Sequence, residues 1–220
     1  MLEKKHDKYF LRFTYAEEVS LNRTPVKEQT ICSVDLGINT DAVCTIMRPD
    51  GTILGRKFIN FPSDKDRMYR VLGRIRRFQR EHGSRQVQGK WAYAKRLNTE
   101  LGRKIAREIV LYASEKKADV IVFEYLEMKG KLSGKKKQKL QMWRKRDIQK
   151  RCGQQAHRKG IRISRICAWN TSRLAFDGSG KIDRDIQDHR LCTFQNGKRY
   201  NCDLSASYNI GARYFISLKF

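Results

Sequence analysis

The sequence predicts an α/β fold, a mixed β-sheet flanked by helices, and three observations carry this prediction. Residues 30–60 contain three apolar runs separated by tight turns, which is typical of an antiparallel meander. Residues 119–124 (DVIVFE) form a short apolar run with the length and β-branching of a buried parallel strand. Helical periodicity follows residue 62. A chain of 220 residues is long enough to bury one substantial core.

The N-terminal part of the chain predicts strands. Residues 8–15 (KYFLRFTY) alternate and predict a strand, and the polar residues 16–29 predict a linker. The meander is then expected as strands at 30–36, 42–48 and 53–60. The triplet Pro49-Asp50-Gly51 is a strong turn signal between the last two of these strands.

The rest of the chain predicts helices with two further strands. After Pro62, one helix face is apolar, with Met68, Val71, Leu72, Ile75 and Phe78. A second helix is expected over about 92–117 and a third over about 138–159, ending at Gly160. Strands are expected at 119–124 and 161–166, an irregular stretch at 173–202, and a closing helix at 203–215.

The charge predicts a polyanionic partner. The chain has 48 Lys+Arg against 23 Asp+Glu, a net charge of +25, and nucleic acid is the commonest partner of such a chain. A membrane partner is disfavoured because no apolar run approaches the ~18–20 residues of a spanning helix. The charged N-terminus has no signal-peptide pattern, so a cytoplasmic location is expected, with the six cysteines reduced.

Three carboxylates lie at the ends of predicted strands or at the start of a predicted helix, where they could bind a metal ion. Asp35 follows the apolar stretch 31–34, Glu124 ends the run 120–123, and Asp203 begins the last helix. Buried carboxylates need partners, and like charges brought together need cations. Mg²⁺, with Mn²⁺ as a substitute, suits such oxygen ligands, and two ions about 3.5–4 Å apart can promote phosphodiester hydrolysis. The structural alternative is that each acid is a turn residue or a helix cap.

Four segments of the sequence stand out as motifs: VDLGINTDAV (34–43), VIVFEYLEM (120–128), Asn170-Thr171-Ser172, and DLSASYNIGARYF (203–215), which includes Asn209. In their order and spacing they resemble the TnpB proteins, transposon-encoded relatives of the type V CRISPR effectors. This resemblance implies an RNase H-like (RuvC) fold with Asp35, Glu124 and Asp203 as catalytic and metal-binding residues. It also implies an endodeoxyribonuclease with a two-metal-ion mechanism, whose partners are a guide RNA and a target DNA.

The resemblance also implies a domain organisation. Residues 1–28 would be the remnant of an N-terminal β-barrel domain with its linker, and residues 29–172 and 203–220 would form the RuvC-like nuclease domain. Residues 173–202 would be the insertion that contacts target nucleic acid. The chain would thus be a catalytic half, completed by a separate N-terminal half or by a full-length homologous protein.

The insertion departs from the family pattern in its cysteines. Members of the family usually carry CxxC pairs that bind zinc there, whereas this chain has no CxxC pair and only Cys192 and Cys202 in the interval. Zinc is therefore not expected.

Two basic surfaces are predicted to contact phosphates. The segment 129–165 contains many Lys and Arg residues but a single acidic residue, Asp147. The alternative is a solvated helix face, the usual fate of charge runs. The predicted contacts are Arg67, Arg70, Arg74 and Arg77 in the first helix and Lys135, Lys136, Lys137, Arg144, Arg146, Lys150 and Arg151 in the basic segment.

Two other functions remain as alternatives. One is a non-catalytic RNA- or DNA-binding accessory subunit of a guided complex, against which the presence of all three carboxylates argues. The other is a stand-alone resolvase-like nuclease, against which the long basic insertions and the Asn170-Thr171-Ser172 segment argue.

Overall fold

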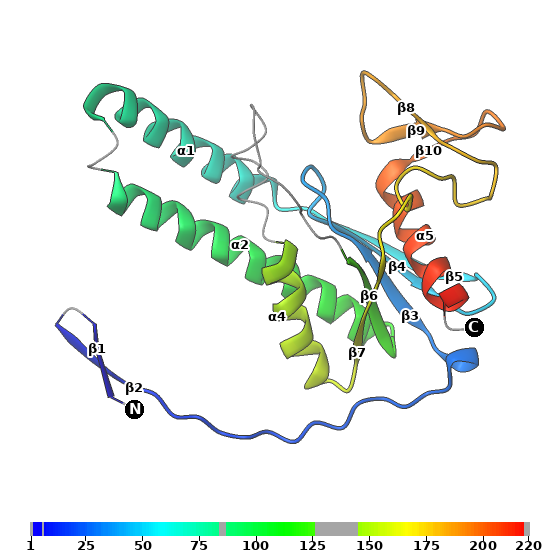
Figure 1. The fold of residues 1–220 in the computed structure, drawn as a ribbon, viewed down its shortest axis with the longest axis horizontal. Coiled ribbons are helices and arrows are strands. Elements are labelled where there is room, and N and C mark those ends of the chain that lie inside the picture. The colour runs from blue at the N-terminus through cyan, green and yellow to red at the C-terminus, as the bar shows by residue number, and fades with distance from the viewer. Residues whose placement is uncertain (1, 6, 84–86, 126–144, 218–220) are drawn as a thin grey trace.

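The core of the molecule is a five-stranded mixed sheet with strand order β5-β4-β3-β6-β7 (Figure 1). The computed structural model describes residues 2–5, 7–83, 87–125 and 145–217. The sheet strands are β3 (Ile31–Asp35), β4 (Ala42–Met47), β5 (Ile53–Ile59), β6 (Val120–Tyr125) and β7 (Arg162–Cys167). The first three are antiparallel, and β6 and β7 extend the sheet in parallel from β3, so the predicted meander and the predicted parallel strand are both confirmed.

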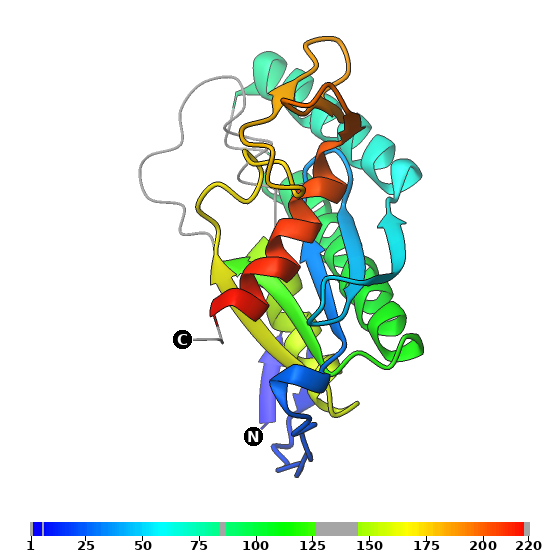
Figure 2. The same ribbon diagram turned by 90° about the vertical axis from the view of Figure 1, so that its right-hand side faces the viewer.

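Helices cover both faces of this sheet (Figure 2). The helices are α1 (Pro62–His82), α2 (Gln88–Glu115), α4 (Lys145–His157) and α5 (Cys202–Ser217). Alternate residues of a strand point to opposite faces. Ile31 of β3 accordingly packs in an apolar cluster with Ile210 of α5, whereas Cys32 packs in another cluster with Ile109 of α2 and Cys152 of α4.

The helix α1 extends beyond the sheet and packs along α2 (Figure 1). It begins with Pro62, whose fixed φ suits a first helical turn. It ends at Gly83, which adopts a φ of 74° that residues with a Cβ rarely adopt. Three of its predicted apolar residues, Met68, Val71 and Ile75, are buried.

The N-terminal segment differs from the predicted single strand over 8–15. The chain forms a two-stranded hairpin, β1 (Leu2–Lys5) and β2 (Lys8–Leu11), at the far end of an extended stretch (Figure 1). The strand ends at Leu11 because its partner β1 has only four residues with which to pair. The 3-10 turn η1 (Val26–Glu28) then leads into the sheet.

The segment 173–202 is more regular than the sequence predicts. It contains a small antiparallel sheet of β8 (Asp183–Arg184), β9 (Leu191–Thr193) and β10 (Arg199–Asn201). Strands of two or three residues leave no periodic pattern in a sequence, and this sheet is ordered by a local core of Ala175, Cys192, Phe194 and Cys202. Within the described ranges, no helix combines the length and the apolar character that crossing a membrane requires.

Candidate active site

Asp35 and Glu124 lie side by side on neighbouring parallel strands. Val34 of β3 is in register with Phe123 of β6, so the next residues of the two strands are Asp35 and Glu124. Ile31 of β3 and Val122 of β6 pack in the cluster beneath α5, and the period of two places Asp35 and Glu124 on that same face. The predicted approach of these two carboxylates is a consequence of this register.

Asp35 is held in an unfavourable electrostatic environment. Burial against the sheet raises the pKa of the Asp35 carboxyl to about 7, and the negative charges of Glu124 and Asp203 contribute to the increase. The positive charges of Lys145 and Arg184 oppose it only in part. The three predicted carboxylates are therefore close enough for Asp35 to experience the charges of the other two.

Glu124 is buried and has specific partners. The residue is 6% exposed, and the Lys145 ammonium donates to its Oε2 at 3.3 Å. The Thr171 hydroxyl donates to the other oxygen, Oε1, and Gln149 Nε2 donates to the backbone carbonyl of Glu124 at 3.0 Å. These contacts come from α4 and from the loop after β7, which therefore fix the position of this carboxylate.

Asp203 enters the site from the first turn of α5, which packs closely on the sheet. A Cβ at Gly211 would lie 2.8 Å from the Met47 sulfur and 3.2 Å from Ser33 Oγ, so a larger residue here would force these side chains to shift. Ser207 and Thr45 share a buried hydrogen bond of 2.7 Å between the helix and β4. Ala206 and Ser207 are buried small residues on the same helix, and this close packing brings Asp203 toward Asp35.

The loop after β7 is fastened to α5 by Asn209. Its amide Nδ2 donates to the carbonyl oxygens of Thr171 at 2.9 Å and Leu174 at 2.7 Å. Because Thr171 also donates to Glu124, Asn209 positions a direct partner of the site. The sequence analysis named Thr171 and Asn209 only as parts of motifs that resemble a known family, and it predicted no contacts for them.

Lys145 and Gln149 are site residues that the sequence analysis missed. Both lie at the beginning of α4, and Lys145 is one of many basic residues in its segment. No local pattern distinguishes it from the neighbouring Arg146, which is exposed. Only the packing of α4 against the end of β6 shows that Lys145 is directed to Glu124.

The donor set suits an oxygen-coordinated divalent cation. Burial first, and then the negative charges of Glu124 and Asp203, raise the pKa of Asp35, and a bound Mg²⁺ or Mn²⁺ would stabilise its ionised form. Across the residues described, no three His, Cys, Asp or Glu side chains are close enough together to bind one ion as they lie, and Glu124 is paired with Lys145. Binding a metal here would require these side chains to reorient.

The two cysteines of the segment 173–202 lie close to each other, and both are near enough to Asp203 to feel its charge. Cys192 in β9 and Cys202 at the start of α5 are both buried, and burial raises the pKa of each thiol, that of Cys202 to about 12. His189 is exposed, and its Nδ1 lies 3.2 Å from the Asp185 carbonyl oxygen. A thiol whose pKa is raised is a poor metal ligand until it loses its proton.

The predicted phosphate contacts occupy two helices. Arg67, Arg70, Arg74 and Arg77 are exposed on α1, and Arg67 also donates to the Tyr93 hydroxyl at 2.6 Å. Arg146 and Lys150 are exposed on α4, whereas Arg151 is partly buried and pairs with Asp147 at 3.0 Å. The predicted residues Lys135, Lys136, Lys137 and Arg144 lie outside the described residues. Their contact with nucleic acid stays a prediction.

Comparison with known proteins identifies the fold through solved structures. No protein-family model matches the chain, and no curated protein matches its sequence. Cas12f1, in a complex with sgRNA and target DNA, has a TM-score of 0.66 at 19% identity, with 82% of this chain and 49% of that chain covered. AacC2c1 in a binary complex with sgRNA has a TM-score of 0.62 at 10% identity, with coverage of 86% and 39%.

CasPhi-2 (Cas12j) bound to crRNA is a third match, with a TM-score of 0.57 at 12% identity and coverage of 90% and 51%. The chain therefore spans about half of these proteins or less. Likeness at such low identity concerns the fold alone. The fold is RNase H-like (RuvC), a mixed sheet flanked by helices similar to the RuvC-like domains of Cas12 effectors, and the predicted fold class is confirmed.

Proposed function

We propose that this chain is a TnpB-like, RuvC-type DNA endonuclease that cleaves under RNA guidance as the catalytic half of a larger assembly. The observation that carries the proposal is that Asp35 lies beside Glu124 in the β3–β6 register, where burial first and then the charges of Glu124 and Asp203 raise the pKa of Asp35. The fold supports it, since the similar solved structures include Cas12f1 with sgRNA and target DNA. The net charge of +25 agrees with a polyanionic substrate.

The three carboxylates would bind Mg²⁺, which when bound supplies activation of water and stabilisation of the leaving oxygen. The chain itself supplies the rigid base of the site. The parallel pairing of β3 and β6 fixes the spacing of Asp35 and Glu124, and the close approach of α5 at Gly211 brings in Asp203. Thr171 and Lys145 orient the Glu124 carboxylate, and Lys145 balances its charge.

The exposed arginines of α1 would bind the phosphates of the nucleic acid. Such contacts contribute affinity without sequence information, so target choice is assigned to the guide RNA. The proposed partners are a guide RNA, a target DNA, and a separate N-terminal half or a full-length homologous protein.

A cleavage assay with the assembled complex tests this proposal. The chain is co-expressed with its candidate partner, the RNA that co-purifies is sequenced, and cleavage of a matching DNA is measured with Mg²⁺. We expect Asp35→Ala to abolish cleavage and to leave nucleic-acid binding nearly unchanged, because Asp35 contributes no positive charge to binding.

Asp66→Ala is the matched control, since Asp66 is an exposed carboxylate of α1. This variant is expected to cleave as the wild type does. Cleavage that survives Asp35→Ala would exclude the proposed site. RNA-independent cleavage of four-way junctions would instead identify a resolvase.

A further inference from the structure

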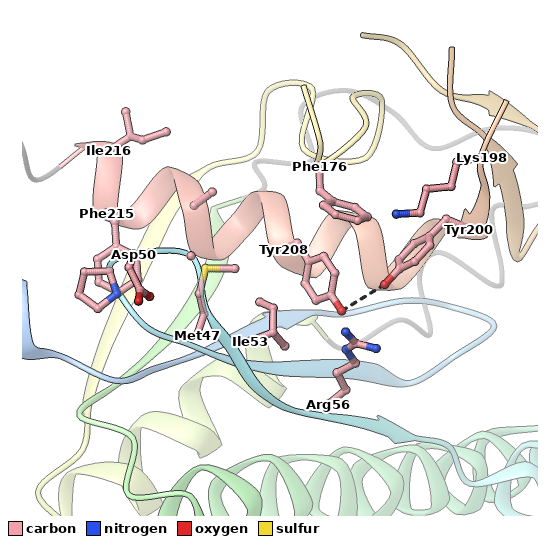
Figure 3. A pocket seen from close by; sticks show the side chains of 13 residues that line it. Met47, Asp50, Ile53, Arg56, Phe176, Lys198, Tyr200, Tyr208, Phe215 and Ile216 are labelled. Carbon is pink, nitrogen blue, oxygen red and sulfur yellow. Dashed lines mark hydrogen bonds between the residues drawn. The ribbon is translucent and has the colours of Figure 1, made fainter. Parts of the chain in front are cut away.

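A cavity of about 460 Å³ lies along α5 (Figure 3), and its lining includes none of the three carboxylates. It extends from the β4–β5 turn, at Asp50 and Gly51, to Tyr200 of β10. In the register of the sheet, this turn is at the end of β4 opposite to Val43, the partner of Asp35. The volume is within the ~300–1,000 Å³ range of small-molecule sites, so the cavity can accept a ligand of nucleotide size.

One end of the cavity is aromatic. The ring of Phe176 packs against those of Tyr200 and Tyr208, with centroid distances of 5.0 and 4.9 Å. The two tyrosine hydroxyls share a hydrogen bond of 3.2 Å, as the dashed line in Figure 3 shows. These contacts connect the insertion to α5 and make the wall of this end rigid.

Two cations lie over this aromatic wall. The Arg56 guanidinium is 5.6 Å from the centroid of the Tyr208 ring, and the Lys198 ammonium is 5.1 and 5.3 Å from those of Phe176 and Tyr200. Both side chains are exposed. Hydrogen bonds from Ser179 and, in smaller part, the charge of Lys198 lower the pKa of Asp177, so one carboxylate lies near this end of the cavity. Arg56 and Lys198 thus supply two cations at the aromatic end of the cavity, where an anion with several oxygens, such as a phosphate, can bind.

The other end of the cavity has the opposite character. Met47, Ile53 and Phe215 supply apolar surface, and Asp50 lies beside them (Figure 3). Asp50 accepts hydrogen bonds of 2.9 Å from both the backbone N–H and the hydroxyl of Thr52. An anion here repels a phosphate and accepts hydrogen bonds from an amino group, so a ligand with both groups can bind in one direction only.

We propose that this cavity binds one nucleotide, with its phosphate at Arg56 and Lys198 and an amino-bearing base over Met47 and Ile53 beside Asp50. The nucleotide is either a free mononucleotide or one unit of a single strand, because both present the same groups. The assignment goes beyond the proposed function, since the cavity lies outside the carboxylate site and binding requires no cleavage.

Calorimetric titration of the full chain in EDTA buffer tests the proposal, with AMP, IMP, adenosine and inorganic phosphate as the probes. AMP is expected to bind at least about tenfold more tightly than phosphate or adenosine, since only AMP reaches both ends of the cavity. IMP, which has a carbonyl in place of the amino group, is expected to bind about threefold more weakly than AMP. Equal binding of AMP and phosphate would overturn the proposal, and equal binding of AMP and IMP would overturn the placement of the base beside Asp50.

Two variants locate the binding. Arg56→Ala/Lys198→Ala is expected to weaken AMP binding at least about tenfold, by loss of two charge-assisted contacts. Lys117→Ala/Lys159→Ala removes the same charge from exposed positions outside the cavity lining and is the matched control, expected to bind as the wild type does. If both double variants lost the same affinity for AMP, the binding would depend only on the net charge of the protein, and the proposed site would be overturned.

Ala212→Trp tests the cavity itself. Ala212 is an exposed residue of α5 that lines the cavity, so an indole there fills it without a change of charge. Loss of AMP binding in this variant is expected, and unchanged binding would overturn the proposal. If the variant does not fold, the two double variants still decide the question.

A fluorescein-labelled adenine 12-mer distinguishes the two forms of the ligand. If the cavity binds one unit of a strand, AMP competes with the 12-mer and Arg56→Ala/Lys198→Ala weakens both. If it binds a free mononucleotide, only AMP is affected by the variant. Asp35→Ala is expected to leave AMP binding unchanged, so failure of this site and failure of the nuclease site are distinguishable.

Discussion

The two ends of β6 carry carboxylates with opposite effects on the fold. Asp119 directly precedes the strand and is almost fully buried. Its carboxylate accepts hydrogen bonds from the backbone N–H of Thr30 at 2.8 Å, from the Thr24 hydroxyl at 2.7 Å and from the Asn22 amide. These donors fasten the N-terminal linker to the sheet, so this carboxylate stabilises the structure.

Asp35 and Glu124, at the other end of β3 and β6, are differently placed. Burial and like charge raise the pKa of Asp35, and Glu124 depends on the single cation Lys145 and the Thr171 hydroxyl. A buried carboxylate whose donors all belong to the fold is structural, and one whose charge the fold leaves unbalanced is available to an added cation. Of the acids at the two ends of β6, Asp119 therefore stabilises the fold, whereas Glu124, with Asp35 beside it, is available for function.

The largest expected effect is a gain of stability in Asp35→Asn. The Asp35 carboxyl has a pKa of about 7 in the folded chain, against about 4 in the unfolded chain. Its ionisation therefore destabilises the fold, by an amount that increases as the pH rises from about 4 to about 7 and is constant above that. In EDTA buffer at pH 8, Asp35→Asn should be more stable than the wild type by up to about 4 kcal/mol.

Urea denaturation at pH 5, 6, 7 and 8 measures this difference. The advantage of Asp35→Asn should shrink as the pH falls, because the wild-type carboxyl then takes up a proton. An advantage that is independent of pH would show that the charge of Asp35 is not the cause.

Asp119→Ala is expected to lower the free energy of unfolding, whereas Asp35→Asn raises it. Removing the carboxylate takes the acceptor from the Thr30 N–H and the Asn22 amide, and leaves the Thr24 hydroxyl with Asn22 Oδ1 as its remaining acceptor. A loss of about 2–3 kcal/mol is expected from the lost hydrogen bonds to a buried carboxylate, measured by the same urea denaturation. A neutral or stabilising Asp119→Ala would remove the distinction between the two ends of the strand.

A smaller loss is expected for Thr24→Val, which removes one of the donors to Asp119 and keeps the shape of the side chain. The expected cost is about 1 kcal/mol, the usual contribution of one hydrogen bond. In the double variant with Asp119→Ala the two losses should not add, since both remove the same contact. Additive losses would show that Thr24 acts through other contacts.

Much of this arrangement is predictable from the sequence, but the roles of the acids are not. The run DVIVFE predicts the strand, and its length places Glu124 at the end of it. The same run begins with Asp119, and only tertiary contacts distinguish the two acids. Lys145 escaped prediction because its neighbours are equally basic, and the β8–β10 sheet because its strands are too short to leave a pattern.

Binding of Mn²⁺, followed by electron paramagnetic resonance at pH 8, tests the central claim most directly. The account predicts that the wild-type chain binds Mn²⁺ and that Asp35→Asn weakens this binding by at least about tenfold, since a metal ligand is lost. Asp66→Asn, which changes an exposed carboxylate of α1, should bind as the wild type does. Binding by Asp35→Asn as tight as that of the wild type would contradict the assignment of Asp35, Glu124 and Asp203 as a metal site.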